Sequence, residues 1–351
     1  MTKLRIGYWP LSANLNSAGD RRRVLFWARE RGHTVITDLS QKVDLYFVSE
    51  RADFNSKFFH STKTPIIFDL IDAYLSPANL GNDIARGIAK SFSHQVTGPI
   101  KPFSKHVEDF CIKSNAVFCS SPEQAKLIEH FNPNTHVILD SHDEIPFLPP
   151  RQFDQTPRTD LRILWEGQAA TIRGIRQLIP ALQLISENHS IALNFVTDEK
   201  YFKVLGKYMV RETSNLLQKD LGSLYSKSTI TSWSVENLVS AALSCNASLI
   251  PINLSSPMQA LKPENRLLIM WRLGLPCLTS SSAAYERVLK RAGVNSNCKN
   301  VSDWYEKIEE LMTDPLSGYE QVIKGQNYVR ENHTAAILLS KWDHAVESVL
   351  S

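Results

Sequence analysis

The stretch KPENRLLIMWRLGLPCLT, residues 262–279, sets the expected fold of the second half of this chain. Pro263 is suited to the first turn of a helix, where its missing N–H leaves no hydrogen bond unmade. Lys262 and Arg266 bracket that helix start, and a helix N-terminus itself attracts anions. The motif Gly-Leu-Pro at 274–276 then leads into a short apolar run that predicts a buried strand. A helix followed at once by a buried strand is typical of an α/β domain.

Similar short apolar runs recur along the chain, with amphipathic stretches between them. In the second half they lie at 161–165, 191–196, 228–233, 247–252 and 276–279, and in the first half at 4–8, 34–36, 45–49, 65–69, 116–120 and 137–139. Buried strands that alternate with helices predict parallel sheets covered by helices on both faces. We therefore expect an α/β protein with two Rossmann-like, doubly wound parallel sheets.

The sequence divides into two expected domains. Prolines cluster within residues 146–157, a texture that excludes a helix or a central strand there. The expected bounds are an N-terminal domain at 1–148, a linker at 149–160 and a C-terminal domain at 161–332, with a helix at 333–351 that carries an apolar stripe. Ligands of open parallel sheets bind beyond the carboxyl ends of the strands, so we expect the two domains to face a central cleft that holds the site.

Composition and charge exclude several classes of protein. The net charge of +3 comes from 39 basic and 36 acidic side chains, a balance that does not favour nucleic acid. No window reaches the roughly 18 consecutive apolar residues of a membrane-spanning helix, and the first residues predict a strand and not a signal peptide. The five cysteines form no Cys-x-x-Cys pair and are expected to be reduced. These features predict a cytoplasmic protein.

Four stretches carry a resemblance to a known family. Residues 262–279 resemble the donor-site helix and following strand of GT-B glycosyltransferases, and 163–168 with Arg173-Gly174 look like the first strand and phosphate-proximal loop of the same domain. Residues 17–21 resemble part of the family's first β-loop-α unit, and 117–124 the strand and turn that open the last helix of its N-terminal domain. The resemblance is to the large retaining glycosyltransferase family 4. It implies the GT-B fold, a donor site on the C-terminal half, and a last helix that crosses back to the first domain.

A nucleoside diphosphate leaving group needs its developing charge stabilised by a metal or by fixed cations and N–H groups. The sequence has no Asp-x-Asp metal motif, so we expect no metal and no cofactor besides the nucleotide-sugar co-substrate. The expected donor-binding residues are Gly167, Gln168, Arg173, Lys262, Glu264, Asn265 and Arg266.

Some of these positions depart from the pattern that the resemblance implies. Gln168 stands where the family usually has an arginine, and Arg173 where it commonly has a diphosphate-binding lysine. Ile269 stands where retaining members usually place the glutamate that holds the donor ribose, and isoleucine cannot accept a hydrogen bond. Glu264, at the start of the same helix, takes over the ribose contact in one interpretation and is an ordinary first-turn acid in the other.

Candidate catalytic groups lie in the first half. Asp69 and Asp72 follow the apolar run 66–68, and His142 follows another strand, so each is expected near a sheet edge. An acid there serves as general base for an acceptor hydroxyl or orients it, whereas turn aspartates, a helix cap and a structural histidine are the alternatives. Gly19 and Arg21 open the first helix and are expected on the acceptor side, with a solvated helix start as the alternative.

Residues 84–110 mix Ile, Phe and Val with Arg and Lys. Basic and apolar residues together favour the interface of an anionic membrane. Peripheral contact with the inner face of a membrane is one interpretation of this segment, and a mobile acceptor-side loop is the other.

The leading functional hypothesis is transfer of a sugar from a nucleotide-sugar donor to a hydroxyl of a glycan or lipid-linked acceptor, as in polysaccharide biosynthesis. The resemblance alone favours retention of configuration. The alternatives are a catalytically silent GT-B protein that binds a partner or ligand, which Ile269 and Gln168 favour, and a nucleotide-sugar epimerase, which would need acid and base groups on both faces of the sugar. The sugar, the base, the acceptor and the oligomeric state depend on loop shape, which periodicity does not reveal.

Overall fold

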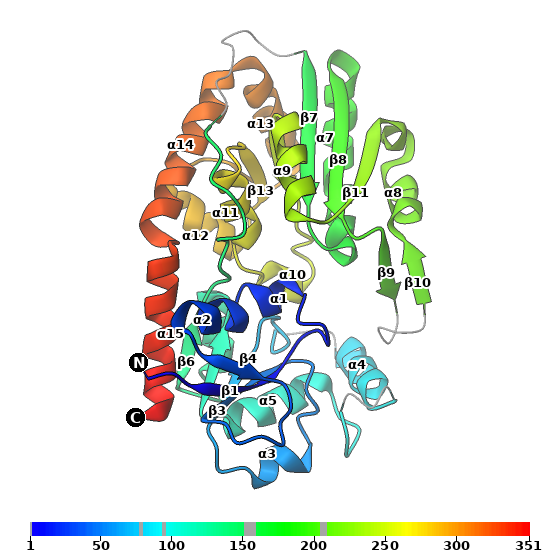
Figure 1. The fold of residues 1–351 in the computed structure, drawn as a ribbon. Coiled ribbons are helices and arrows are strands. Elements are labelled where there is room, and N and C mark those ends of the chain that lie inside the picture. Colours follow the sequence, from blue (N-terminus) through cyan, green and yellow to red (C-terminus); the bar gives the residue numbers. More distant parts are fainter. Residues whose placement is uncertain (1, 77–79, 93–95, 151–158, 204–208) are drawn as a thin grey trace. The chain divides into compact units, whose positions relative to one another are not determined.

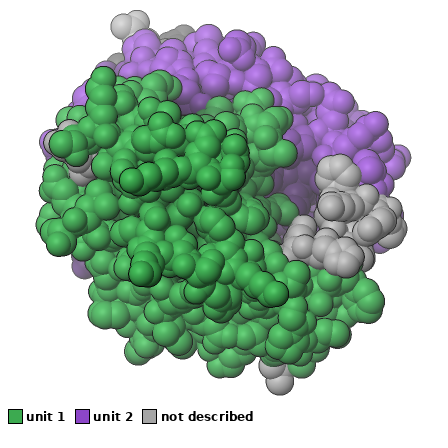
Figure 2. All heavy atoms as spheres, turned by 60° about the horizontal axis from the view of Figure 1, so that its bottom comes forward, with its two compact units in different colours: residues 1–142, 256–263, 334–351 green, residues 143–255, 264–333 purple. Residues whose placement is uncertain are grey.

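The structure is a computed structural model that describes residues 2–76, 80–92, 96–150, 159–203 and 209–351 (Figure 1). It contains two compact units, coloured separately in Figure 2: unit 1 comprises residues 1–142, 256–263 and 334–351, and unit 2 comprises 143–255 and 264–333. The first boundary therefore falls at His142, before the expected domain end at 148, and residues 256–263 belong to unit 1 although the sequence places them in the C-terminal domain. Most of the expected linker, residues 151–158, lies outside the described residues.

Unit 1 is built on a six-stranded parallel sheet in the order β2-β1-β3-β4-β5-β6. Its strands are β1 (Arg5–Trp9), β2 (Thr34–Ile36), β3 (Leu45–Ser49), β4 (Ile66–Asp69), β5 (Ala116–Cys119) and β6 (Thr135–Val137). Its helices are α1 (Ala18–Arg21), α2 (Val24–Arg31), α3 (Lys57–Ser61), α4 (Leu80–Phe92), α5 (Phe103–Lys113), α6 (Pro122–Ile128), α10 (Pro257–Ala260) and α15 (Ala335–Leu350). Every residue of β3, β4 and β5 is buried, as expected of central strands covered on both faces.

The C-terminal helix α15 is part of unit 1 because its apolar face packs on α2. The ring of Trp342 stacks on Trp27 with centroids 5.6 Å apart, and both rings are fully buried. Asp343 accepts hydrogen bonds from Trp27 Nε1 at 2.9 Å and from Arg31 Nη2 at 2.6 Å, which fixes the angle at which the helix docks.

Unit 2 holds a second six-stranded parallel sheet, in the order β11-β8-β7-β12-β13-β14. Its strands are β7 (Asp160–Glu166), β8 (Ser190–Thr197), β11 (Ser228–Ser232), β12 (Ala247–Ile250), β13 (Cys277–Ser280) and β14 (Asn297–Cys298), and β9 (Lys200–Lys203) and β10 (Met209–Glu212) form a separate antiparallel pair. The helices are the 3₁₀ segments η1 (Ala169–Leu178) and η2 (Gly222–Lys227), and α7 (Ile179–Asn188), α8 (Thr213–Leu221), α9 (Val235–Ser244), α11 (Asn265–Arg272), α12 (Ala283–Ala292), α13 (Val301–Thr313) and α14 (Pro315–Asn332). The two sheets confirm the predicted doubly wound α/β class.

Close packing places α11 firmly within unit 2. Gly274 ends the turn after this helix with a φ of +70°, and a Cβ there would lie 2.5 Å from the carbonyl oxygen of Pro149, so only glycine fits. On α14, a Cβ at Gly325 would come within 2.3 Å of the Trp271 ring, which lies against that helix. Two glycines therefore allow α11 to pack closely, one against Pro149 and the other against α14. Within the described residues, no helix is both long enough and apolar enough to cross a membrane.

Candidate functional site

The strand order of unit 2 reverses between β7 and β12. From β7 the chain passes outward through β8 to β11, then returns to β12 and continues through β13 to β14 on the other side. At such a switch point the connections leave the two neighbouring strands in opposite directions, and ligands of open parallel sheets bind there, beyond the carboxyl ends of the strands. Gly167 follows β7 directly, so it lies at this point.

Gly167 allows Arg266 to lie against the end of β7. The glycine has a φ of +151°, which side-chain-bearing residues rarely adopt, and a Cβ would lie 3.3 Å from both Arg266 Cζ and Trp165 Cη2. Arg266 is the second residue of α11, so its charge lies at the N-terminal end of that helix. The structure thus brings together two of the residues that the sequence singles out for donor binding.

The guanidinium of Arg266 is only partly satisfied. Its Cζ lies 4.8 Å from the centroid of the Trp165 ring, and its Nε lies 3.6 Å from Glu166 Oε2, too far for a hydrogen bond. Arg266 Nε and Nη2 are buried and donate no hydrogen bond to any of the described residues. Unpaired buried donors are costly, so this arrangement is suited to an anionic ligand that accepts from them.

Glu166, the last residue of β7, is part of this site, although it is not among the donor-binding residues expected from the sequence. Its side chain is 8% exposed, and its Oε1 accepts a hydrogen bond of 2.9 Å from Trp233 Nε1. Its Oε2 is buried and has no hydrogen-bond partner among the residues that the structure describes. In the sequence, Glu166 is a single acidic residue after the apolar run Ile163-Leu164-Trp165. This pattern is also typical of a strand that ends in solvent.

The first residues of α11 have different surroundings. Glu264 is 1% exposed, and its two carboxylate oxygens accept from Arg287 Nη1 and Nη2, each at 3.2 Å. Arg287 belongs to α12 and was not foreseen. Asn265 Oδ1 is buried without a hydrogen-bond partner among the described residues. Ile269 is 1% exposed, in the interior of unit 2.

Gln168 and Arg173 lie on the segment that leaves β7. Gln168 precedes η1, and Arg173, within η1, is exposed and forms no ion pair with another described residue. A Cβ at Gly174 would lie 2.4 Å from the carbonyl oxygen of Pro251, so η1 passes close to the end of β12. Both predicted residues are therefore near the switch point of the unit 2 sheet.

Lys262 lies in unit 1, although the resemblance implies a place in the donor domain. Its Nζ is 3.3 Å from Asp72 Oδ1, with side chains 34% and 31% exposed. The neighbouring Leu261 carbonyl accepts from Ser121 Oγ at 3.2 Å. An ion pair this exposed contributes about 0–1 kcal/mol, so Lys262 keeps its capacity to bind a ligand anion.

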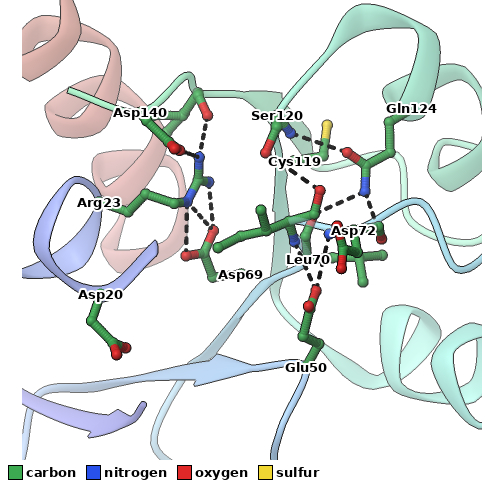
Figure 3. Close-up of polar contacts among 12 residues, drawn as sticks. Asp20, Arg23, Glu50, Asp69, Leu70, Asp72, Cys119, Ser120, Gln124 and Asp140 are labelled. Atoms are coloured by element: carbon green, nitrogen blue, oxygen red, sulfur yellow. Dashed lines mark hydrogen bonds and ion pairs between the residues drawn. The ribbon is translucent and has the colours of Figure 1, made fainter. Parts of the chain in front are cut away.

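A buried ion cluster lies at the carboxyl edge of the unit 1 sheet (Figure 3). Arg23, with a side chain 0% exposed, places Nη2 2.6 Å from Asp69 Oδ1 and Nη1 3.3 Å from Asp140 Oδ1. Its Nη1 also donates to the Ile138 carbonyl at 2.5 Å. Burial raises the pKa of Asp69, and Arg23 opposes that shift. With its carboxylate bound to Arg23 and 1% exposed, Asp69 is better suited to positioning than to proton transfer.

The loop after β1 is organised by Asp20. This carboxylate is 0% exposed and accepts from Tyr8 Oη at 2.6 Å and from the Leu11 N–H at 2.8 Å, and it also accepts from the hydroxyls of Ser12 and Ser17. Gly19 lies where a Cβ would come within 2.3 Å of Leu11 Cδ1. Arg21 donates to the Asn16 carbonyl. The two predicted acceptor-side residues therefore lie in α1, packed and hydrogen-bonded against this loop.

Asp72 lies on a main chain that is held from two sides (Figure 3). Glu50 Oε2 accepts from the N–H groups of Ile71 and Asp72 at 3.2 and 3.0 Å. Gln124 Nε2 donates to the carbonyls of Leu70 and Asp72 at 2.9 and 3.1 Å. Burial, and next the charge of Asp72, raise the pKa of Glu50 to about 8. His142, the third predicted catalytic residue, is the last residue of the first segment of unit 1 and is 4% exposed.

No protein-family model and no curated protein matches this chain. Several solved structures are similar to it. TarM from S. aureus, in a complex with fondaparinux, α-GlcNAc-glycerol and UDP, has a TM-score of 0.59 at 11% identity over 88% of this chain and 57% of its own. Sucrose-phosphate synthase from Thermosynechococcus elongatus has 0.57 at 11% identity, over 97% and 80%. WaaG, a glycosyltransferase involved in lipopolysaccharide biosynthesis, has 0.54 at 12% identity, over 97% and 98%.

The chain has the GT-B fold. The likeness confirms the fold expected from residues 163–168 and 262–279, and at this level of identity it shows the fold alone. The chain spans 54–57% of the length of the TarM chains that it matches.

Proposed function

We propose that this protein transfers a sugar from a nucleotide-sugar donor to a hydroxyl of a glycan or lipid-linked acceptor. The observation that carries the proposal is the cationic site in unit 2, where Arg266 lies against Gly167 with Nε and Nη2 unbonded. A partly buried guanidinium with two open donors at a helix N-terminus matches the diphosphate of a nucleotide.

We propose further that fixed cations, without a metal, stabilise the departing nucleoside diphosphate. Arg266 meets the diphosphate at the switch point, and Arg173, exposed on η1, supplies a second charge. Arg266 is packed against Gly167 and the Trp165 ring, so it needs little reorganisation as negative charge develops on the leaving oxygen. Among the structural neighbours, the TarM complex holds UDP, which supports a nucleotide as the ligand of this fold.

On the acceptor side we propose that Asp72 binds the acceptor hydroxyl, with Gly19 and Arg21 on the adjoining helix α1. The side chain of Asp72 is 31% exposed, whereas the carboxylate of Asp69 is buried in an ion pair with Arg23. Retention of configuration is part of the proposal and rests on the sequence resemblance.

A lipid-linked acceptor would bring the protein to a membrane surface. Ile84, Ile88 and Phe92 lie four residues apart on α4 and are 38%, 37% and 72% exposed, so they form an apolar stripe. Nearby Lys101 and Lys105 are paired with Asp109 and Glu108, which lowers the net positive charge of this region. Peripheral membrane contact is therefore proposed through apolar residues, and sedimentation with phospholipid vesicles tests it.

The experiment that tests the proposed function is a thermal-shift screen with UDP, GDP, ADP, CDP and TDP and their common sugar conjugates, with and without magnesium. A ligand that binds the native state raises its apparent stability, so the cognate base is identified by the largest shift. A shift that does not need magnesium supports the proposal. The absence of any shift at millimolar concentrations would contradict it.

A catalytically silent ligand-binding protein is the second candidate, and the buried Ile269 favours it. The resemblance implies a glutamate at this position in active members, and an isoleucine side chain cannot accept the hydrogen bonds that a glutamate accepts. Release of nucleoside diphosphate from the donor that gives the largest shift distinguishes the two candidates, because a silent protein binds the donor without turnover.

A further inference from the structure

We propose that Glu166 binds hydroxyl groups of the nucleotide-sugar donor and thereby selects it. This inference rests on the proposed function and concerns the same site in unit 2. The ligand chemistry is a pair of neighbouring hydroxyls, carried either by the ribose or by the sugar to be transferred.

The burial of Glu166 requires a partner for its second oxygen. The side chain is 8% exposed, Oε1 is bound to Trp233 Nε1, and Oε2 accepts no hydrogen bond from a described residue. Leaving a buried carboxylate oxygen unbonded is costly, and an ion-pair distance of 3.6 Å to Arg266 Nε offsets only part of that cost. A ligand donor at Oε2 would complete the coordination.

The charge of Glu166 determines which ligand group it can meet. An ionised carboxylate and a phosphate are both hydrogen-bond acceptors without a donor, and their negative charges repel each other. A phosphate therefore does not bind at Oε2. A neutral hydroxyl donates to the carboxylate without that repulsion. Arg266, immediately beside it, has the opposite requirement, because its open Nε and Nη2 are donors. The two side chains together match a phosphate that is followed closely by a hydroxyl-bearing ring, as in a nucleotide or a sugar phosphate.

The geometry of Glu166 is fixed before any ligand arrives. The main chain of Glu166 pairs in register with Val196 of β8, and Trp233 Nε1 donates a hydrogen bond of 2.9 Å to Oε1. Thr197, the last residue of β8, adds an Oγ1 that is buried without a partner among the described residues. Two polar atoms with free capacity therefore lie at adjacent strand ends of one sheet.

Glu166 is preferred over Glu264 because only Glu166 has an oxygen to spare. Both oxygens of Glu264 are bound to Arg287 at 3.2 Å, and its side chain is 1% exposed. Ile269 has no hydrogen-bonding group. Of these three residues, Glu166 alone is able to accept from a hydroxyl in the described structure.

The test is isothermal titration of the nucleoside diphosphate that gives the largest thermal shift, of its 2′-deoxy and 3′-deoxy analogues, and of its sugar conjugates, into the wild-type protein and Glu166→Gln. Glutamine keeps an acceptor for Trp233 and removes the charge. We expect the wild-type protein to prefer the hydroxylated ligand over the analogue lacking the hydroxyl by roughly 10- to 100-fold, and Glu166→Gln to lose most of that preference.

The analogues distinguish the two sources of the hydroxyls. Loss of discrimination against a deoxyribose analogue assigns Glu166 to the ribose. Loss of the preference for the sugar conjugate over the free diphosphate assigns it to the transferred sugar. Equal weakening of all ligands, no weakening, or a wild-type protein that never discriminates would overturn the inference while leaving nucleotide binding in place. A wild-type protein that binds no nucleotide would overturn the proposed function and this inference with it.

Discussion

Arg23 Nη2 lies 2.6 Å from Asp69 Oδ1, and the two side chains are 0% and 2% exposed. Asp140 adds a second carboxylate to the same guanidinium at 3.3 Å. The pair joins α2 to the end of β4 at the edge of the sheet that carries Asp72. It therefore fixes the local structure on which the proposed acceptor side depends.

Replacing Arg23 by methionine leaves two buried carboxylates without their cation. We expect a loss of about 3–5 kcal/mol in the free energy of unfolding, measured by urea denaturation at pH 7, because breaking a buried pair strands a charge. Arg29→Ala, which removes an arginine 69% exposed and paired with its neighbour Glu30, should cost less than about 0.5 kcal/mol. A loss below about 1 kcal/mol for Arg23→Met would show that the cluster is solvated, contrary to the account.

Glu50 makes the stability of unit 1 depend on pH. Burial and the Asp72 charge raise its folded pKa to about 8, above the ordinary value of 4.5, while Lys90 and Arg51 partly oppose the shift. A group whose pKa is raised by folding contributes fully to the free energy of unfolding at pH values below its unfolded-state pKa. That contribution is lost as the pH rises through its folded-state pKa. We expect the difference in unfolding free energy, wild type minus Glu50→Gln, to fall steadily between pH 5 and pH 8.

Lys90 changes the size of this trend but not its sign. Burial lowers its pKa to about 8, and the charge of Glu50 opposes that shift. In Glu50→Gln the pKa of Lys90 therefore falls further, so the variant gains stability as the pH rises and the difference still falls. Chemical denaturation at four pH values across this window supplies the measurement. A difference that stays constant across the window would mean that Glu50 is ionised throughout.

Gly167→Ala should weaken nucleoside diphosphate binding more than it destabilises the protein. The added methyl group lies 3.3 Å from Arg266 Cζ at a φ of +151°, so the guanidinium must shift. Gly293→Ala is the matched control, since Gly293 has a φ of +67° and no atom within 4 Å of a Cβ. Both variants should lose about 1–2 kcal/mol of stability through backbone strain. Only Gly167→Ala should reduce the affinity, by about tenfold or more in titration calorimetry; equal affinities for the two variants would separate Gly167 from the ligand.

Trp342→Ala tests the docking of α15 on unit 1. The Trp342 ring is 0% exposed and stacks on Trp27 with centroids 5.6 Å apart. Removing so large a buried side chain should cost about 3–5 kcal/mol in unfolding free energy. Lys341→Ala, an exposed neighbour on the same helix, is the control and should be nearly neutral. A near-neutral Trp342→Ala would mean that α15 contributes little to the stability of unit 1.

The strands could be predicted from the sequence because buried parallel strands form continuous apolar runs. The run at 161–165 is β7, and the run at 276–279 overlaps β13. The glycine and proline after α11 likewise predicted where that helix ends, and the structure shows the physical reason in the close approach of Pro149 to Gly274.

The side-chain partners were not accessible, because they join residues far apart in the chain. Glu166 accepts a hydrogen bond from Trp233, 67 positions away, and nothing local distinguishes it from a solvated strand end. Arg23 is one of three adjacent arginines, and its contacts with Asp69 and Asp140, 46 and 117 positions away, place it in the buried ion cluster. Lys262 precedes α11 in sequence but belongs to unit 1, where Asp72 binds it.

The diphosphate site on Arg266 can be tested by isothermal titration of the nucleoside diphosphate that gives the largest thermal shift into wild type, Arg266→Ala and the control Arg29→Ala. We expect wild type and Arg29→Ala to bind with the same affinity and Arg266→Ala to bind on the order of 10- to 100-fold more weakly, because charge-assisted hydrogen bonds to the diphosphate are lost. Unchanged affinity in a folded Arg266→Ala protein would rule out this site and place the nucleotide elsewhere.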